Sequence, residues 1–418
     1  MPTKEITINM TKVRTSYIGS LFSIFLFSSL LIATSFSNAQ SIEEQQPISD
    51  PVTDYMNAID NVEAEYSAYS PELSDLYLGL GKSLYSRQEY SEARQAFQRG
   101  MQIERVNKGL DSLSQSPYLL SIADTESFMG NWDNSQKALE NLYSINTKAY
   151  GQNDIRLLPV LDKMLDFYLN SYDERTASGG YANLVISEQI GSKIYNIMLD
   201  DMPLDSPDAP ARYRRLGSLQ YFIANHIKQH GEPSESGVSF STGGSARRSD
   251  ATTSHMHFRR GKMALQKVVE SVVQQEDSTE RDQAIAVAEL GDWYLVFGQR
   301  FSAAEAYQLA YDVLETAEQP ELARAELFEQ PRAINFSLDT PPDNNKTPAD
   351  QLEVSVTISA YGVPQDIEVL GDTENLSKEQ LGSLRRQVSG QRFRPKLLDG
   401  KAEAAPHIVF YDLPAPKG

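Results

Sequence analysis

The chain has 418 residues, a formal net charge of −19 and no cysteine. This length exceeds what one compact core usually holds, so it predicts two domains or a repeat array. The acidic surface repels nucleic-acid phosphates and anionic lipid head groups, and the absence of cysteine excludes disulfides, thiol nucleophiles and thiolate metal sites.

Residues 1–39 have the features of a secretory signal peptide. Three basic residues precede the uncharged stretch 18–36, which is rich in Leu, Phe and Ile, and the small residues Ser37 and Ala39 follow it. This order predicts export and cleavage before Gln40, and therefore a periplasmic protein of a Gram-negative bacterium. If the leader stays uncleaved, its apolar stretch could just span a bilayer and anchor the chain in the inner membrane. No later stretch is apolar enough to span a membrane, so we expect no stable span after cleavage.

A repeated helical pattern occupies residues 71–330. In the first unit, small residues at positions 8, 20 and 27 alternate with large ones at fixed spacing: Tyr77, Leu80, Gly81, Leu84, Tyr90, Ala93, Phe97 and Gly100. Two antiparallel helices approach closely where one of them presents a small residue and large neighbours fill the groove beside it. The spacing resembles that of the tetratricopeptide repeat (TPR).

The unit recurs with a period of 42 residues, against ~34 in the usual repeat, which predicts helices about two turns longer in total. The third unit is interrupted by Gly179-Gly180, the fourth is split by a flexible Gly/Ser-rich insertion at 231–254, and the fifth is regular again. Ahead of the first unit, residues 55–62 carry an apolar helical stripe that we expect to cap the stack.

The composition changes after Pro331. Residues 351–360 alternate apolar and polar side chains, which predicts a strand, and 366–370 reads as the returning strand. A short helix at 376–388, an extended segment at 392–395 and a last strand at 407–411 follow.

These elements resemble the C-terminal domain of the TonB family. The features that match are the alternating first strand, the turn residue Gly362, the short helix, the Arg-Phe-Arg-Pro run at 392–395 and the Asp-Gly turn at 399–400. The family often has a Trp before this run, where this chain has Gln391. The resemblance implies a module that meets a partner by pairing strand edges. TonB itself also needs a membrane span and a long Pro-rich spacer, so we carry over the module and not energy transduction.

The predicted fold class is mainly α: a TPR-like α-solenoid followed by a small α+β domain of order β-β-α-β-β. The predicted divisions are a signal peptide at 1–39, an N-terminal segment with the capping helix at 40–70, the repeats at 71–330, a linker at 331–350, the TonB-like domain at 351–413 and a tail at 414–418.

A search for catalytic motifs finds none. The sequence contains no Gly-x-Ser-x-Gly, phosphate loop or dinucleotide fingerprint. His226 and His230 have a spacing that can bind a metal on a helix, but they lack the Glu of a metalloprotease motif and a third ligand, so an exposed polar face explains them better. We therefore expect a non-enzyme without cofactors or metal.

Two sets of residues are candidates for partner binding. In TPR solenoids, position 9 of each unit faces the groove lined by the first helices. Here the candidates at that position are Lys82, Asp124, Asp166 and Asp292, which would suit a basic or extended peptide. The alternative is that an acidic protein carries Asp at many exposed positions.

The second set is a basic docking patch in the C-terminal domain, for the acidic solenoid or an acidic partner. Its residues are Arg385, Arg386, Arg392 and Arg394. The alternative is a solvated face whose charge is offset by nearby acids.

The sequence favours an exported, non-catalytic scaffold or adaptor that binds other cell-envelope proteins through both modules and does not bind nucleic acid. Two alternatives remain: a membrane-anchored TonB-like component of energy transduction, and a glycan- or peptide-binding protein of the cell envelope.

Overall fold

A computed structural model describes residues 50–172, 177–231, 250–338, 351–370 and 376–412. The predicted signal peptide and C-terminal tail lie outside these ranges, as do residues 232–249 of the predicted insertion. The described residues are mainly helical, with a small C-terminal sheet region.

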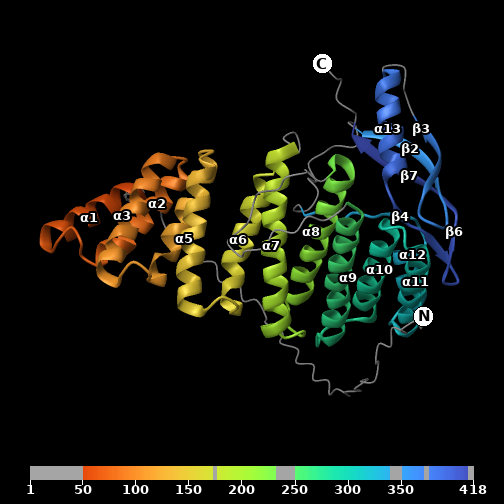
Figure 1. Ribbon diagram of the computed structural model, residues 1–418, viewed down its shortest axis with the longest axis horizontal. Helices are drawn as coiled ribbons and strands as arrows, with labels where there is room; N and C mark the ends of the chain where they lie inside the picture. The colour runs from red at the N-terminus through yellow and green to blue at the C-terminus, as the bar shows by residue number, and fades with distance from the viewer. Residues whose placement is uncertain (1–49, 173–176, 232–249, 339–350, 371–375, 413–418) are drawn as a thin grey trace, which may run out of the picture. The chain divides into compact units, whose positions relative to one another are not determined.

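Twelve α-helices precede the sheet in the part of the chain that the structure describes (Figure 1). They are α1 Pro51–Glu65, α2 Glu72–Ser86, α3 Tyr90–Lys108, α4 Ser116–Phe128, α5 Trp132–Tyr150, α6 Leu158–Asn170, α7 Ala177–Asp201, α8 Ala209–His230, α9 Asp250–Gln274, α10 Glu280–Val296, α11 Arg300–Val313 and α12 Pro320–Phe328.

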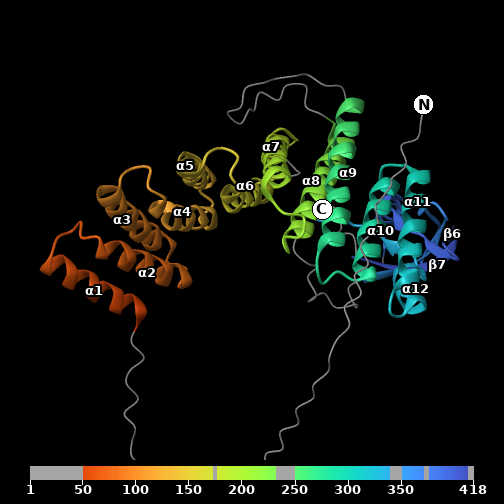
Figure 2. The ribbon, with the colours of Figure 1, turned by 90° about the horizontal axis from the view of Figure 1, so that it is seen from below.

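The helices from α2 to α11 form five successive hairpins at the positions where the sequence predicts five units. Each hairpin contacts the next, through α3 with α4, α5 with α6, α7 with α8 and α9 with α10. Figure 2 shows the hairpins following one another in chain order. We call α2, α4, α6, α8 and α10 the first helices, and α3, α5, α7, α9 and α11 the second helices.

Glycines on α2 and α10 let the first and the fifth hairpin close, as the repeat spacing predicts. A Cβ on Gly81 of α2 would overlap the ring of Phe97 on α3, and a Cβ on Gly291 of α10 would overlap the ring of Tyr307 on α11. Both rings are almost fully buried. The glycine thus makes room for a large aromatic side chain from the facing helix.

The structure differs from the sequence-based expectation at two places in these helices. Helix α7 begins at Ala177 and runs through Gly179-Gly180 without a break, so the predicted interruption of the third unit is wrong. Helix α9 begins at Asp250, within the predicted insertion 231–254. For α7, two glycines in place of alanines destabilise a helix by only about 2 kcal/mol, and the packing of α7 against α6 and α8 offsets this cost.

The residues described between 351 and 412, which we call the C-terminal module, contain six strands and one helix. These are β2 Gln351–Ile358, β3 Pro364–Val369, α13 Lys378–Gly390, β4 Phe393–Arg394, β5 Lys396–Leu398, β6 Lys401–Glu403 and β7 Ala405–Asp412. Strands β3, β2 and β7 form an antiparallel sheet in that order, with Val354 of β2 opposite both Val369 of β3 and Val409 of β7. Helix α13 begins with a capping box between Ser377 and Gln380.

The predicted order β-β-α-β-β holds only in outline, because the segment after α13 is divided into three short strands. Asp399 and Gly400 both have positive φ, of 49° and 75°, and this turn joins β5 to β6 as a hairpin. Positive φ at both central residues is what a tight two-residue hairpin requires, which explains the Asp-Gly pair.

The predicted linker 331–350 is partly structured. Arg332–Ala333 form strand β1, which pairs antiparallel with β4 in the register Arg332 with Arg394 and Ala333 with Phe393. Beyond it, Ile334, Phe336 and Leu338 pack against the helical core. The sequence pattern missed this strand because it is two residues long and its partner lies far along the chain.

Two hydrophobic cores result. The larger runs through the helices from Val52 onward and includes Leu397 of β5. The smaller lies between α13 and the sheet and includes Val354, Val356 and Leu384. Strands β4 and β5 therefore connect the C-terminal module to the core of the helices.

Candidate functional site

The four predicted groove residues lie on first helices, but the acids among them are already paired. Asp124 of α4 lies 3.5 Å from the Nζ atom of Lys163 on α6, and Asp166 of α6 pairs with Arg215 on α8. Lys82 of α2 is exposed. In both pairs the acid is at position 9 of one unit and the basic residue at position 6 of the next unit.

These pairs form a series of ion pairs along the first helices. Asp162 extends it, because its carboxylate lies 2.5 Å from Arg212 and 3.7 Å from Arg215. The side chains are partly exposed: 48% for both Asp124 and Lys163, and 50% for Asp166. Exposed pairs contribute little stability, but they neutralise the carboxylates that the sequence alone offers to a basic ligand.

Asp292, the last candidate in the groove, is different because it is buried and its partner comes from the C-terminal module. The guanidinium of Arg394 on β4 donates from Nη2 to Oδ2 of Asp292 at 2.6 Å and from Nε to Oδ1 at 3.0 Å. The side chains of Arg394 and Asp292 are 5% and 11% exposed. A candidate of the groove and a candidate of the docking patch thus bind each other.

A tyrosine completes this buried cluster. The hydroxyl of Tyr307 on α11 donates to Oδ1 of Asp292 at 2.9 Å. Burial, with the Asp292 carboxylate beside it, raises the pKa of Tyr307 well above its usual value, so the hydroxyl keeps its proton. Burial alone would lower the pKa of Arg394, but the attraction of Asp292 outweighs it and the pKa is raised. The Arg394 guanidinium therefore keeps its charge and the Tyr307 hydroxyl its proton inside this cluster.

Further contacts hold the C-terminal module on the last helices. A Cβ on Gly362 would overlap the Phe393 carbonyl and the Leu295 side chain of α10, and the ring of Tyr361 stacks on Arg300 of α11, 5.0 Å from its Cζ atom. The β5–β6 hairpin contacts α12 and α11. Arg394 thus pairs with Asp292 of α10 much as Lys163 pairs with Asp124 and Arg215 with Asp166, but it comes from the C-terminal module.

The other residues of the predicted docking patch do not join Arg394. Arg385 and Arg386 are exposed on α13, and Nη1 of Arg392 donates to the carbonyl oxygens of Ser389 and Gln391 at 3.2 and 2.9 Å. The four arginines therefore form no single surface. The sequence places them within ten residues, but the strand and the helix turn them in different directions.

The two histidines at helical spacing contact each other and a tyrosine. Their ring centroids are 4.9 Å apart, and Nδ1 of buried His226 shares a 2.8 Å hydrogen bond with the hydroxyl of Tyr172. Among the described residues, no group of three or more His, Asp or Glu is placed to hold a metal ion.

Within the same residues, no helix combines the length and the apolarity needed to cross a bilayer.

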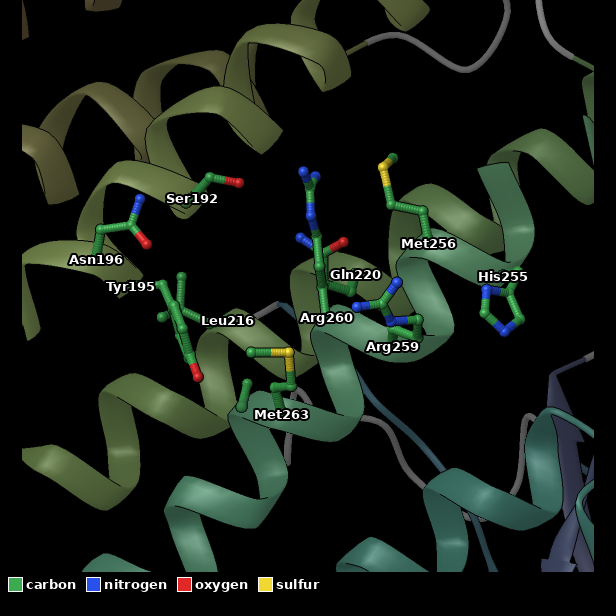
Figure 3. A pocket seen from close by; sticks show the side chains of 12 residues that line it. Ser192, Tyr195, Asn196, Leu216, Gln220, His255, Met256, Arg259, Arg260 and Met263 are labelled. Carbon is green, nitrogen blue, oxygen red and sulfur yellow. The ribbon is translucent and has the colours of Figure 1, made fainter. Parts of the chain in front are cut away.

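A cavity of about 530 Å³ lies between α7, α8 and α9, apart from the residues that the sequence singled out (Figure 3). Ser192, Tyr195 and Asn196 line it from α7, and Arg259 and Arg260 from α9. A larger hollow of about 1020 Å³ between α5, α6 and α7 shares the lining residues Ser192, Asn196 and Arg260 with it. Sequence reasoning missed this cavity because its lining comes from three helices and carries no motif.

Comparisons with known proteins give a distant structural likeness only. No protein-family model matches this chain, and no curated protein matches it. The crystal structure of BtubC (BKLC) from P. vanneervenii is similar, with a TM-score of 0.38 and 10% sequence identity over 71% of this chain and 94% of that chain. A likeness at this level carries no argument about function.

Proposed function

We propose that this chain is a non-catalytic scaffold or adaptor of the cell envelope of a Gram-negative bacterium. In this proposal the helical hairpins are a TPR-like solenoid that binds one protein partner, and the C-terminal module is TonB-like and binds another. Export to the periplasm through the predicted signal peptide belongs to the same proposal.

The exposed edge strand of the C-terminal module is the observation that carries this proposal. Strand β7 pairs with β2 on one side only among the described residues. Its side chains Ile408 and Phe410 are 47% and 58% exposed, on the face of the sheet opposite α13. An open strand edge offers unpaired backbone groups to a partner strand, and exposed apolar side chains beside it favour such a contact.

The buried pair between Asp292 and Arg394 supports the adaptor reading in a second way. It fixes the C-terminal module against α10 and α11, so partners bound to the two modules would be held in a constant relation to each other. The outward surfaces of the first helices and of β7 stay available, since neither Lys82 nor Phe410 takes part in this junction.

The test is cross-linking and capture in the periplasm of the source bacterium, with the full chain carrying a C-terminal tag. Two variants remove one surface each: Ile408→Lys with Phe410→Lys on β7, and Lys82→Glu on α2. Arg386→Gln, an exposed change on α13, is the matched control. We expect each surface variant to lose a different set of partners and the control to lose none. Capture of nothing above background by the unaltered chain would overturn the proposal.

A further inference from the structure

The cavity between α7, α8 and α9 is lined by basic side chains, although the protein as a whole is acidic. The chain has a net charge of −19, yet among the residues that the structure describes the side chains with a full charge that line this cavity are those of Arg259 and Arg260. Amide and hydroxyl groups of Gln220, Asn196 and Ser192 supply further hydrogen-bond donors. Donors without lining carboxylates make a site for an anion.

Gln220 is a donor fixed inside the cavity. Gln220 is only 5% exposed, and its Oε1 forms a 2.7 Å hydrogen bond with Nδ1 of His257. Burial lowers the pKa of His257 to about 4, so the ring is neutral and its Nδ1–H donates to Oε1. The Nε2 of Gln220 has no hydrogen-bond partner within the described residues, and it is left for a ligand in the cavity.

The two arginines differ in whether a carboxylate already neutralises their charge. Arg260 pairs with Glu188 of α7, at the wall between this cavity and its larger neighbour. Arg259 is exposed and has no carboxylate partner among the residues that the structure describes. Arg259 therefore carries the uncompensated charge, and Arg260 is held in place by its pair.

Tyr195 of α7 and His255 of α9 also line the cavity, and the remaining lining is apolar. Leu216 of α8 and Met263 and Ala264 of α9 face the cavity, and Met256 lies beside Arg259 (Figure 3). Methionine side chains adapt their shape to unbranched chains. We propose that this cavity binds a small amphipathic carboxylate, with the carboxylate at Arg259 and the Gln220 amide and the apolar chain along Leu216, Met263 and Ala264.

The size of the cavity suits this class of ligand. Pockets of roughly 300–1000 Å³ hold small molecules, with apolar walls and a few placed polar groups. A single free guanidinium and one fixed amide match one carboxylate better than a phosphate with two charges. A purely polar anion would leave the apolar side chains of the cavity in contact with water. A neutral hydrocarbon would leave the donors of Arg259 and Gln220 without hydrogen-bond acceptors.

Calorimetric titration of the purified chain with decanoate tests the site, with decanol as the neutral comparison. We expect saturable binding of one decanoate and at least about tenfold weaker binding of decanol, since a hydrogen bond to a charged group is worth about that much. Arg259→Gln is expected to weaken decanoate binding about tenfold. Met263→Trp, which fills the cavity without changing its charge, is expected to abolish it.

The exposed arginine of α13 again provides the matched control, since Arg386→Gln removes the same charge far along the chain and is expected to leave the affinity unchanged. Circular dichroism of each variant checks that the helices are retained. Failure of the unaltered chain to bind decanoate overturns the proposal. So does binding that Arg259→Gln and Met263→Trp leave intact, because decanoate would then sit elsewhere. Neither result bears on the capture experiment with the envelope proteins.

Discussion

Asp292 and Arg394 show how burial changes the value of one ion pair. Both are almost fully buried and make two hydrogen bonds to each other, and Asp292 accepts a third from the hydroxyl of Tyr307. Lys163 and Asp124 have the same charges at an equivalent position, but both are half exposed and lie 3.5 Å apart. Losing one partner of a buried pair leaves a charge without compensation, whereas an exposed charge is solvated by water.

Replacing Arg394 with Met is therefore expected to lower the free energy of unfolding by about 3–5 kcal/mol, because the Asp292 carboxylate stays buried without its partner. Lys163→Met at the exposed pair should cost less than about 1 kcal/mol. Urea denaturation followed by circular dichroism measures both. If the two variants lose equal stability, the junction is not held by this pair.

Tyr307→Phe tests the third member of the cluster. It removes a hydroxyl that donates to Asp292 and keeps the aromatic ring, so we expect a loss of about 1–2 kcal/mol in the free energy of unfolding. The same denaturation experiment measures it. A loss as large as that of Arg394→Met would instead assign the main stabilising contact to the tyrosine.

His257 makes stability depend on pH. Burial lowers its pKa in the folded protein to about 4, while the unfolded chain has the ordinary value of about 6.5. Between these values only the unfolded chain binds the proton, so the contribution of His257 is present above pH 6.5 and is lost as the pH falls toward 4. The loss amounts to about 3 kcal/mol.

His257→Gln should remove this contribution. We expect the free energy of unfolding of the variant to fall less than that of the unaltered chain between pH 7.5 and pH 4.5, measured by urea denaturation at each pH. Parallel curves for the two proteins would show that His257 titrates normally in the fold.

At the scale of the elements, glycines decide how closely the helices approach. Gly261 of α9 lies against the ring of Trp293 on α10, and a Cβ there would overlap it. Trp293 is fully buried and its Nε1 donates to the carbonyl oxygen of Phe258 at 3.1 Å, so the ring has little room to move. Gly382 of α13, in contrast, has no atom within 4 Å of its missing Cβ.

The two glycines therefore respond in opposite directions to alanine. Gly261→Ala is expected to destabilise the fold by about 1–3 kcal/mol through overpacking. Gly382→Ala is expected to stabilise it by up to about 1 kcal/mol, since alanine has the higher helix propensity. Thermal unfolding compares the two, and a lower midpoint for Gly382→Ala would contradict the open surroundings of that position.

For the whole molecule, the C-terminal module ends the series of helices. A stack of repeats exposes the apolar side of its last unit unless a cap covers it. Here β4 contacts α10, β6 contacts α11 and β5 contacts α12, and Leu397 of β5 belongs to the helical core.

Deleting the module after Leu338 should therefore weaken the helices next to it more than distant ones. We expect backbone amides of α10 to α12 to lose protection in hydrogen exchange, because Asp292 and the contacts of Leu397 are left open, while α2 to α5 keep theirs. Mass spectrometry of both chains measures the difference. Equal protection in α10 with and without the module would show that the two parts fold independently.

Much of the helical part could be predicted from the sequence by itself. The spacing of small and large residues predicted five hairpins. In the first and the fifth, Gly81 and Gly291 leave the space that the rings of Phe97 and Tyr307 occupy. Alternation predicted β2, and the positive φ that a tight hairpin demands explains the turn at Asp399-Gly400. These features depend on neighbours along the chain, within one helical pair or one turn.

Only the tertiary structure decided which candidates meet. Asp292 and Arg394 are 102 residues apart, and no local pattern records that one is buried against the other. Strand β1 exists only because β4 pairs with it, and the cavity at Arg259 exists only because α7, α8 and α9 enclose it. Charge and burial at these places are properties of packing between distant segments, which a sequence read along its length does not contain.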